Sequence, residues 1–308
     1  MTFPSKVLLR EVGPREGFQT LKKIVPTNEK LELIRLLASA GAPEIEVASF
    51  VRPDRVPQMA DAEEIIQGLP QANILYKGLY LNAKGFERAE QTGRLSNEAW
   101  LYTAASATFL KKNNNTTQEK FYESIPGWIE LFRQYQKPLH GIMISTVFGC
   151  NDEGTIPPET VMNIIEEAQK RVSDSGERFQ EVSLADTVGL GNPENVRKMI
   201  GEIRTMYPSL RVSLHLHDTR GSGMANVYAG LMEGIDCFEA SVGGLGGCPF
   251  AKGAAGNVVT EDVAYLCESL GISTGIDLER YAQAAEYAES ITGLALPGKY
   301  FRVCRPQT

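Results

Sequence analysis

Short apolar runs alternate with longer amphipathic segments along almost the whole chain. The short runs are rich in β-branched residues and predict eight strands, at 7–12, 45–49, 74–81, 98–105, 139–146, 181–186, 211–217 and 237–242. Between them, apolar residues spaced i, i+3 and i+4 predict helices that include 28–41, 158–176 and 193–207. Asn192 before Pro193 is typical of a helix start, and Gly41 and Gly176 are typical of helix ends. The alternation predicts parallel strands joined by crossover helices.

The number of strand–helix units favours an α/β fold of the closed (β/α)8 TIM-barrel type over an open doubly wound sheet. An open sheet usually has fewer strands and a glycine-rich nucleotide turn after the first strand, and the GPREG that follows 7–12 lacks that glycine pattern. No linker, low-complexity tract or charge block divides the 308 residues. We therefore expect one domain over 1–308, with the barrel at about 6–272 and an additional C-terminal helix, 277–293, within the segment 273–308.

Composition narrows the range of partners and compartments. A formal net charge of -7 argues against binding to nucleic acid or to an anionic membrane. The five cysteines are an odd number without a CxxC spacing, which argues against a disulfide framework and against a thiolate zinc site. The first residues lack the apolar core of a signal peptide, and no apolar run approaches the roughly 18 residues of a membrane span. We expect a cytoplasmic protein that binds neither nucleic acid nor membranes.

Polar side chains collect where predicted strands end, which is the side of a TIM barrel that carries catalytic groups. Six of the eight strands show this feature. The residues are Arg15 and Glu16 after the first strand, Glu46 and Ser49 in the second, Asn82 after the third, Asp186 and Thr187 at 181–186, His215, His217 and Asp218 at 211–217, and Cys248 and Asn257 in the glycine-rich loop after the last.

His215 and His217 are two of only three histidines, and their spacing places both side chains on one face of a strand. Together with Glu16 and Asn257 they could hold a divalent cation and leave positions open for a substrate oxygen, which the ion would polarise. The alternative is that both histidines are hydrogen-bonded residues of the barrel mouth without a metal. The donors include no thiolate and suit Mg, Mn, Co or Zn without selecting one.

Three further residues have both a chemical and a structural interpretation. Arg15 could stabilise an oxyanion, or it could form a salt bridge to Glu46 or Asp186. Asp186 could exchange protons, or it could cap the end of its strand. Cys248 lies in the glycine-rich loop, where its thiol could act on a substrate, although a single cysteine is ordinarily inert.

Several stretches together resemble the 3-hydroxy-3-methylglutaryl-CoA lyase family, in a superfamily of metal-dependent TIM-barrel lyases and Claisen-type synthases. The resemblance runs from Lys6 to about Gly293 and rests on VGPREGFQ, IEVASFVRPDRVPQMAD, NAKGFERA, AASATFLKKNNN, EVSLADTVGLGNP, HLHDTRGSGMANVYAGL and GGLGGCPFAKGAAGNVVTED. It implies retro-Claisen cleavage of a 3-hydroxy-3-methylglutaryl-CoA-like thioester to acetyl-CoA and a 3-oxo acid such as acetoacetate. It also implies a divalent cofactor, with Mg or Mn ahead of Zn or Co, an acyl-CoA partner and a homodimer.

The resemblance assigns roles to individual residues. It implies that Glu16, His215, His217 and Asn257 hold the cation, that Arg15 steadies the enolate of acetyl-CoA, and that Cys248 supplies its proton. His215, Asp186 and Glu46 would act beside the substrate, Gln19, Ser49 and Asn82 would bind it, and Glu261 would support the site. Lys22, Lys23, Lys111 and Lys112 follow strands one and four, where they would meet the CoA phosphates or remain ordinary surface lysines.

Some residues depart from the family pattern and bear on the substrate. Glu16 stands where the lyases usually have aspartate; the glutamate is similar to that of homocitrate synthases, where it fills the same ligand role. Its extra methylene shifts the ion or the carboxylate by up to about 1.5 Å. Phe18, Phe148 and Arg220 are bulkier or more charged than expected around the acyl group, and the tail after Gly293 is unlike the common lyase ending. A longer or branched acyl group is therefore an alternative. A Claisen synthase and a non-catalytic ligand-binding barrel are the other two.

Overall fold

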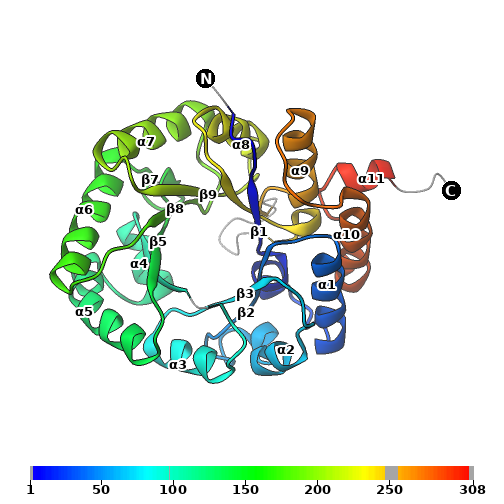
Figure 1. Cartoon of the computed structure of the whole chain (residues 1–308), viewed down its shortest axis with the longest axis horizontal. Coiled ribbons are helices and arrows are strands. Elements are labelled where there is room, and N and C mark those ends of the chain that lie inside the picture. The colour runs from blue at the N-terminus through cyan, green and yellow to red at the C-terminus, as the bar shows by residue number, and fades with distance from the viewer. Residues whose placement is uncertain (1–2, 97, 247–255, 305–308) are drawn as a thin grey trace. The chain divides into compact units, whose positions relative to one another are not determined.

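The computed structural model describes residues 3–96, 98–246 and 256–304, which form two compact units. The middle unit consists of the described residues from 98 to Ile235. The terminal unit consists of Phe3–Ser96 together with the described residues from Asp236 onward. Each unit contains four parallel strands and the helices that connect them. Figure 1 labels most of these elements.

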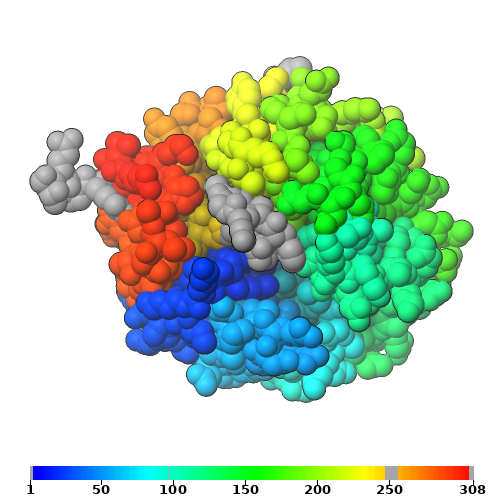
Figure 2. All heavy atoms as spheres, turned by 180° about the vertical axis from the view of Figure 1, so that it is seen from behind, coloured from blue at the N-terminus to red at the C-terminus, as the bar shows by residue number. Residues whose placement is uncertain are grey.

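The terminal unit contains strands from both ends of the chain. β1 (Leu8–Glu11) lies between β2 (Glu44–Ser49) and β10 (Cys237–Ala240), and β3 (Leu75–Leu79) pairs with β2. All of these pairs are parallel, with Leu8 opposite Cys237 and Arg10 opposite Glu44. The helices are α1 (Thr27–Ser39), α2 (Ala62–Gly68), α3 (Ala83–Gln91), α9 (Thr260–Ser269), α10 (Leu278–Thr292) and α11 (Tyr300–Cys304), with short helical turns η1 (Gly13–Gly17), η2 (Pro57–Met59) and η3 (Val242–Gly244). α10 packs beside α1, as both Figure 1 and Figure 2 show.

The middle unit is continuous in sequence. Its parallel strands are β4 (Ala99–Ala104), β5 (Leu139–Ser145), β8 (Glu181–Asp186) and β9 (Arg211–Leu216), in the order β4-β5-β8-β9. The helices are α4 (Ala107–Asn114), α5 (Gln118–Gln134), α6 (Pro158–Asp174), α7 (Pro193–Met206) and α8 (Gly223–Met232). A small antiparallel pair, β6 (Gly149–Cys150) and β7 (Gly154–Thr155), follows β5 and was not predicted from the sequence.

The eight predicted strands are confirmed, and so is the local chemistry of several helix ends. The Asn192 side chain accepts a hydrogen bond from the Asn195 N–H at 2.9 Å and so caps α7. Gly41 and Gly176 follow α1 and α6 with φ of 87° and 74°, a left-handed conformation that favours glycine. The predicted C-terminal helix is α10, which Asp277 caps and Gly293 ends.

Most strands are largely buried on both faces, as expected where helices cover a parallel sheet. Every residue of β8 and β10 is buried, and side chains such as Ile142, Val182 and Leu214 contribute to the core. Burial of an aliphatic side chain of this size stabilises a protein by about 1.5–3 kcal/mol. The packed strands therefore hold the polar residues that follow them in fixed positions. Among the described residues, no helix combines the length and apolar character that crossing a membrane requires.

Candidate active site and metal ligands

Arg15 lies in η1, directly after β1, and its guanidinium joins two carboxylates of the terminal unit. Its Nε and Nη2 each lie 2.5 Å from Oε2 of Glu46, which belongs to β2. Its Nη2 also lies 3.2 Å from Oε2 of the adjacent Glu16. Only 10% of the Arg15 side chain is exposed. The salt bridge to Glu46 that the sequence offered as an alternative is thus present, and it orients the guanidinium.

Charge and burial act in opposite directions on this cluster. Burial would lower the pKa of Arg15, but the charges of Glu46, Glu16 and Glu239 together raise it above its ordinary value, so the guanidinium remains charged. Burial raises the pKa of Glu46, and Arg15 opposes that rise. Glu239 in β10 was missed by the sequence analysis. Its signal was a lone glutamate inside an apolar strand, because a buried carboxylate needs a cationic or hydrogen-bonding neighbour.

Glu16 and Asn257 form a second pair within the terminal unit. The Asn257 Nδ2 donates a hydrogen bond to Oε1 of Glu16 at 3.1 Å, and only 1% of Asn257 is exposed. The Asn257 Oδ1 is buried and has no hydrogen-bond partner among the residues that the structure describes. A buried acceptor left in this condition costs about 1–3 kcal/mol. A cation bound by Oδ1 and by the Glu16 carboxylate would remove that cost, so this pair fits a metal site.

His215 and His217 lie at the end of β9 in the middle unit, with 5% and 3% of each residue exposed. Their Nε2 atoms are 3.0 Å apart, within hydrogen-bonding distance, as the alternative without a metal expects. The same spacing fits one cation, because two nitrogens bound at about 2.1 Å and at right angles to each other, as in octahedral coordination, lie about 3.0 Å apart. The predicted orientation of both rings toward the same side of the strand is confirmed by this distance.

Asp186 ends β8 and is fully buried. Its Oδ1 accepts a hydrogen bond from the Leu190 N–H at 2.9 Å, and its Oδ2 accepts one from the Gly191 N–H at 3.0 Å. Burial raises its pKa, while these N–H groups and the two histidines act in the opposite direction. Asp186 therefore shapes the turn after β8, as the capping interpretation expected, and its carboxylate remains close enough to the imidazoles to interact with them.

The residues expected to bind substrate have different local environments. Ser49 and Gln19 meet, because the Ser49 hydroxyl donates a hydrogen bond to the Gln19 Oε1 at 3.0 Å. Asn82 is exposed and caps α3 by accepting from the Gly85 N–H at 2.9 Å. Lys22 is exposed, and the exposed Lys112 forms an ion pair of 2.7 Å with Asp152. Asn82 and Lys112 thus each have a structural partner of their own.

Glu261 supports the segment that follows β10. It is fully buried at the start of α9, and its Oε2 accepts a hydrogen bond from the Gly243 N–H at 3.1 Å. Burial raises its pKa well above 4.5, which favours the neutral acid. Cys248 lies outside the described residues.

Glu11, the last residue of β1, is buried and its carboxylate accepts four hydrogen bonds, a role that the sequence analysis missed. Its Oε1 accepts from the N–H groups of Gly13 at 2.7 Å and Val242 at 3.0 Å. Its Oε2 accepts from the hydroxyls of Thr260 at 2.8 Å and Tyr281 at 2.6 Å. Glu11 therefore ties η1, η3, α9 and α10 together, and its only signal in the sequence was a glutamate at the end of an apolar strand.

The three bulky departures from the family pattern contact the protein itself. Phe18 and Phe148 are buried, with 1% and 3% exposed. A Cβ at Gly191 would lie 2.9 Å from the Phe148 ring, so this ring packs on the turn after β8. The Arg220 Nη1 donates to the Val188 carbonyl at 2.6 Å in the same turn.

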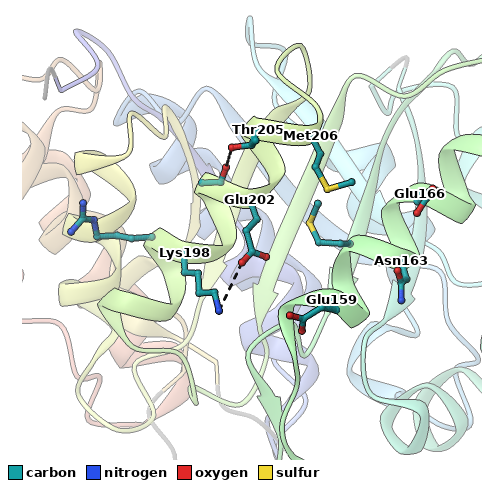
Figure 3. A pocket seen from close by; sticks show the side chains of 10 residues that line it. Glu159, Asn163, Glu166, Lys198, Glu202, Thr205 and Met206 are labelled. Carbon is teal, nitrogen blue, oxygen red and sulfur yellow. Dashed lines mark hydrogen bonds and ion pairs between the residues drawn. The ribbon is translucent and has the colours of Figure 1, made fainter.

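A surface cavity of about 660 Å³ lies apart from all these residues, between α6 and α7 of the middle unit. Figure 3 shows its charged lining, including Glu159, Glu166 and the ion pair between Lys198 and Glu202. None of the candidate catalytic or metal-binding residues that the structure describes lines this cavity.

Comparison with known proteins places these observations in a family context. A family model described as HMGL-like matches residues 6–287. The chain is 40% identical over 294 residues to the 3-hydroxy-3-isohexenylglutaryl-CoA/hydroxy-methylglutaryl-CoA lyase of Pseudomonas aeruginosa, covering 95% of each chain. It is also similar to two solved structures. One is a hydroxymethylglutaryl-CoA lyase from Pseudomonas aeruginosa, with a TM-score of 0.90, 39% identity and 98% of each chain covered.

The second solved structure is an HMG-CoA lyase from Acenitobacter baumannii in complex with coenzyme A and 3-methylmalate, with a TM-score of 0.86 and 35% identity over 98% of this chain and 96% of that one. These likenesses confirm the predicted fold class, an α/β fold whose eight parallel strands have the TIM-barrel arrangement of the lyases.

Proposed function

The chain belongs to the HMGL-like family and is a hydroxymethylglutaryl-CoA lyase-like enzyme, and from this premise we propose that it cleaves 3-hydroxy-3-methylglutaryl-CoA, or a close 3-hydroxyacyl-CoA analogue, to acetyl-CoA and a 3-oxo acid. With the methyl substrate the 3-oxo acid is acetoacetate. The observation that carries the proposal is the pair of imidazole Nε2 atoms 3.0 Å apart at the end of β9, because a lyase of this kind needs a cation beside the substrate hydroxyl.

We assign the cation to Glu16, His215, His217 and Asn257. One carboxylate and two imidazoles are a donor set suited to a divalent ion. The Asn257 Oδ1, which has no hydrogen-bond partner within the described part of the chain, is the fourth donor. When bound, the ion supplies Lewis-acid polarisation of the substrate hydroxyl and carbonyl oxygens. The set contains no thiolate, which is consistent with Mg or Mn and does not exclude Zn or Co.

The chain's own residues move the protons and stabilise the charge. Asp186, whose pKa burial raises, accepts the hydroxyl proton, and the C2–C3 bond breaks with its electron pair left on C2. C3 becomes the ketone of the 3-oxo acid. Arg15, which Glu46 holds in place, stabilises the enolate oxygen of acetyl-CoA, and the Cys248 thiol delivers a proton to C2. One proton leaves the substrate and one arrives, so the reaction consumes none.

We also propose acyl-CoA as the partner of the exposed lysines. Lys22 is exposed, and Lys112 is exposed and forms an ion pair with Asp152. The solved relative with bound coenzyme A supports a CoA thioester as the substrate class. Ser49 and Gln19, which are hydrogen-bonded to each other, are the polar groups that we assign to the acyl chain.

The test is release of acetyl-CoA from a panel of 3-hydroxy-3-alkylglutaryl-CoA thioesters, with Mg or Mn added and then removed by a chelator. Metal-dependent cleavage of the methyl compound is the expected result. No release from any panel member would contradict the proposal. The same assay run with acetyl-CoA and 2-oxo acids separates a lyase from a Claisen synthase, since only a synthase would release free CoA.

A longer acyl group is the second candidate, because one relative carries isohexenylglutaryl-CoA in its name. Release of acetyl-CoA from the isohexenyl compound, without release from the methyl compound, would identify the longer thioester as the substrate. Phe18 is fully buried, and Phe148 and Arg220 contact other parts of the protein. These contacts favour neither the methyl nor the isohexenyl substrate, so the assay with both compounds decides between them.

We further propose a homodimer in the cytoplasm. The family resemblance supports the dimer, and the odd number of cysteines supports a reducing compartment. Light scattering on the purified chain tests the dimer, and a single species at the mass of one chain would contradict it.

A further inference from the structure

The segment 296–298, which lies outside the residues matched by the family model, packs directly on two glycines that follow β10. Gly243 and Gly244 have φ of 62° and 74°. A Cβ at Gly243 would lie 2.6 Å from Cδ1 of Leu296, and a Cβ at Gly244 would lie 2.7 Å from Cγ of Pro297. Real side chains do not approach so closely, so this contact requires glycine at both positions.

The backbone of Gly243 is held from both sides. Its N–H donates to Oε2 of Glu261 at 3.1 Å, and its carbonyl accepts from the Gly298 N–H at 3.1 Å. The two peptide groups that flank the Cα of Gly243 are thus each held by one hydrogen bond, which restricts rotation about both backbone bonds of this glycine. Residues 296–298 therefore fix the direction in which the chain leaves η3.

The segment 296–298 is itself anchored on both flanks. The Leu296 N–H donates to Oε1 of Glu289 in α10 at 3.0 Å. The N–H groups of Lys299 and Tyr300 donate to Oδ1 of Asp262 in α9, at 3.1 Å and 2.7 Å. Leu296 is 2% exposed, so its side chain is part of the core.

The direction set at η3 reaches the residues assigned to the cation. Gly17, next to Glu16, is so close to Leu245 that a Cβ there would collide with the leucine side chain. A Cβ at Gly246 would lie 3.1 Å from Nδ2 of Asn257, the nitrogen that donates to Glu16. Leu245 therefore packs against the residue that follows Glu16, and Gly246 lies beside Asn257.

We propose that Leu296, Pro297 and Gly298 are positioning residues that act through Gly243–Gly246 to hold Glu16 and Asn257 in the arrangement that receives the divalent cation. The inference rests on the proposed function and adds a role for a segment that carries no candidate ligand or catalytic group. Groups that hydrogen-bond directly to metal ligands change metal affinity by about 10- to 100-fold, and for a segment that acts through Gly243–Gly246 we expect the lower end of that range.

The experiment uses the full chain carrying Leu296→Ala, with Mn²⁺ as the probe. Mn²⁺ binding is measured by electron paramagnetic resonance of the free ion, and kcat and KM are measured separately at saturating Mn²⁺. We expect the dissociation constant for Mn²⁺ to rise about tenfold and kcat to fall, with the KM for the acyl-CoA little changed. Leu296→Met, which conserves volume, should restore both values.

Matched controls separate this role from general destabilisation. Leu294→Ala makes the same change two positions earlier on a side chain that is 46% exposed, and Gly127→Ala adds a Cβ in α5 that would have no described atom within 4 Å. Both should bind Mn²⁺ like the wild type. Gly298→Ala, whose Cβ would lie 2.8 Å from Oε1 of Glu261, should weaken Mn²⁺ binding as Leu296→Ala does.

The outcomes are distinct. A cooperatively folded Leu296→Ala variant with wild-type Mn²⁺ affinity and kcat would overturn the inference. If Leu296→Ala fails to fold, Pro297→Ala decides in its place, because it removes the ring that faces Gly244 and leaves the backbone contact. If the wild-type chain itself binds no Mn²⁺, the proposed function is wrong as well.

Discussion

Arg15 and Glu46 form a buried ion pair in which the Nε and Nη2 of the guanidinium each lie 2.5 Å from one carboxylate oxygen. Glu46 stands on β2 and Arg15 in the turn after β1, so the pair fixes the guanidinium relative to two adjacent strands. The charges of Glu46, Glu16 and Glu239 outweigh burial and raise the pKa of Arg15. A fixed cation that does not titrate is what stabilisation of an enolate oxygen requires.

Replacement of Arg15 by methionine should lower kcat by about 10²–10³-fold, because it removes the charge to which we assign stabilisation of the enolate. KM for the acyl-CoA should change little. Steady-state acetyl-CoA release measures both. Arg35→Met is the matched control, since Arg35 is exposed on α1 and pairs with Glu32. Near-normal turnover of Arg15→Met would show that the enolate is stabilised by another group.

Loss of either imidazole at the end of β9 should abolish tight binding of Mn²⁺. His215→Ala and His217→Ala each remove one of two nitrogens that lie 3.0 Å apart, and we expect the affinity for Mn²⁺ to fall at least about 100-fold. The remaining histidine, His140, is hydrogen-bonded to Glu181 at 3.1 Å, and His140→Ala should retain the ion. Calorimetric titration of the three variants checks this prediction, and equal affinities would contradict the assignment of the ligands.

Cys248→Ala should lose orders of magnitude in turnover while still binding the acyl-CoA, because it removes the thiol to which we assign protonation of the enolate carbon. Cys304→Ala, at an exposed position in α11, should keep normal turnover. Pre-steady-state quenching of the reaction separates binding from cleavage. If the Cys248 variant turns over normally, the proton comes from elsewhere.

Asp186→Ala should destabilise the protein, since the N–H groups of Leu190 and Gly191 would lose their acceptor. We expect the free energy of unfolding to fall by about 1–3 kcal/mol, measured by urea denaturation. Asp174→Ala, at an exposed position of α6, is the control and should change it little. Unchanged stability of Asp186→Ala would mean that water replaces the carboxylate.

Glu261 should make stability depend on pH. Burial raises its pKa well above 4.5, so above that pH the folded chain keeps a proton that the unfolded chain releases. The free energy of unfolding of the wild type should therefore fall, relative to Glu261→Gln, as pH rises from about 5 toward 8, by at most about 1.4 kcal/mol for each pH unit. Urea denaturation at four pH values tests this. A difference between the two proteins that stays constant with pH would contradict the raised pKa.

Features that depend on neighbours in the sequence were predicted well. The period of apolar residues located all eight strands, and the i, i+2 spacing of His215 and His217 placed both rings together. Features that depend on distant residues were not accessible in this way. Glu11 and Tyr281 are hydrogen-bonded although 270 positions separate them, and no local pattern marks such a contact.

The same limit explains the substrate-binding residues. Asn82 and Lys112 both follow strands, but residues at such positions also serve structural roles. Asn82 caps α3, and Lys112 forms an ion pair with Asp152. The contact of 296–298 with Gly243 and Gly244 had no signal beyond two glycines in a loop rich in glycine. Tertiary packing, rather than local propensity, decided each of these cases.

The division of the chain into a continuous middle unit and a terminal unit built from both ends sets an order for events on the ribosome. All residues of the middle unit have been synthesised once Ile235 has emerged, so its four strands can pair before translation ends. β1, β2 and β3 are made first, yet β1 obtains its second neighbour only when β10 has emerged. The earliest part of the nascent chain is therefore the last to acquire its complete sheet, and it is the part that a chaperone would have most reason to protect.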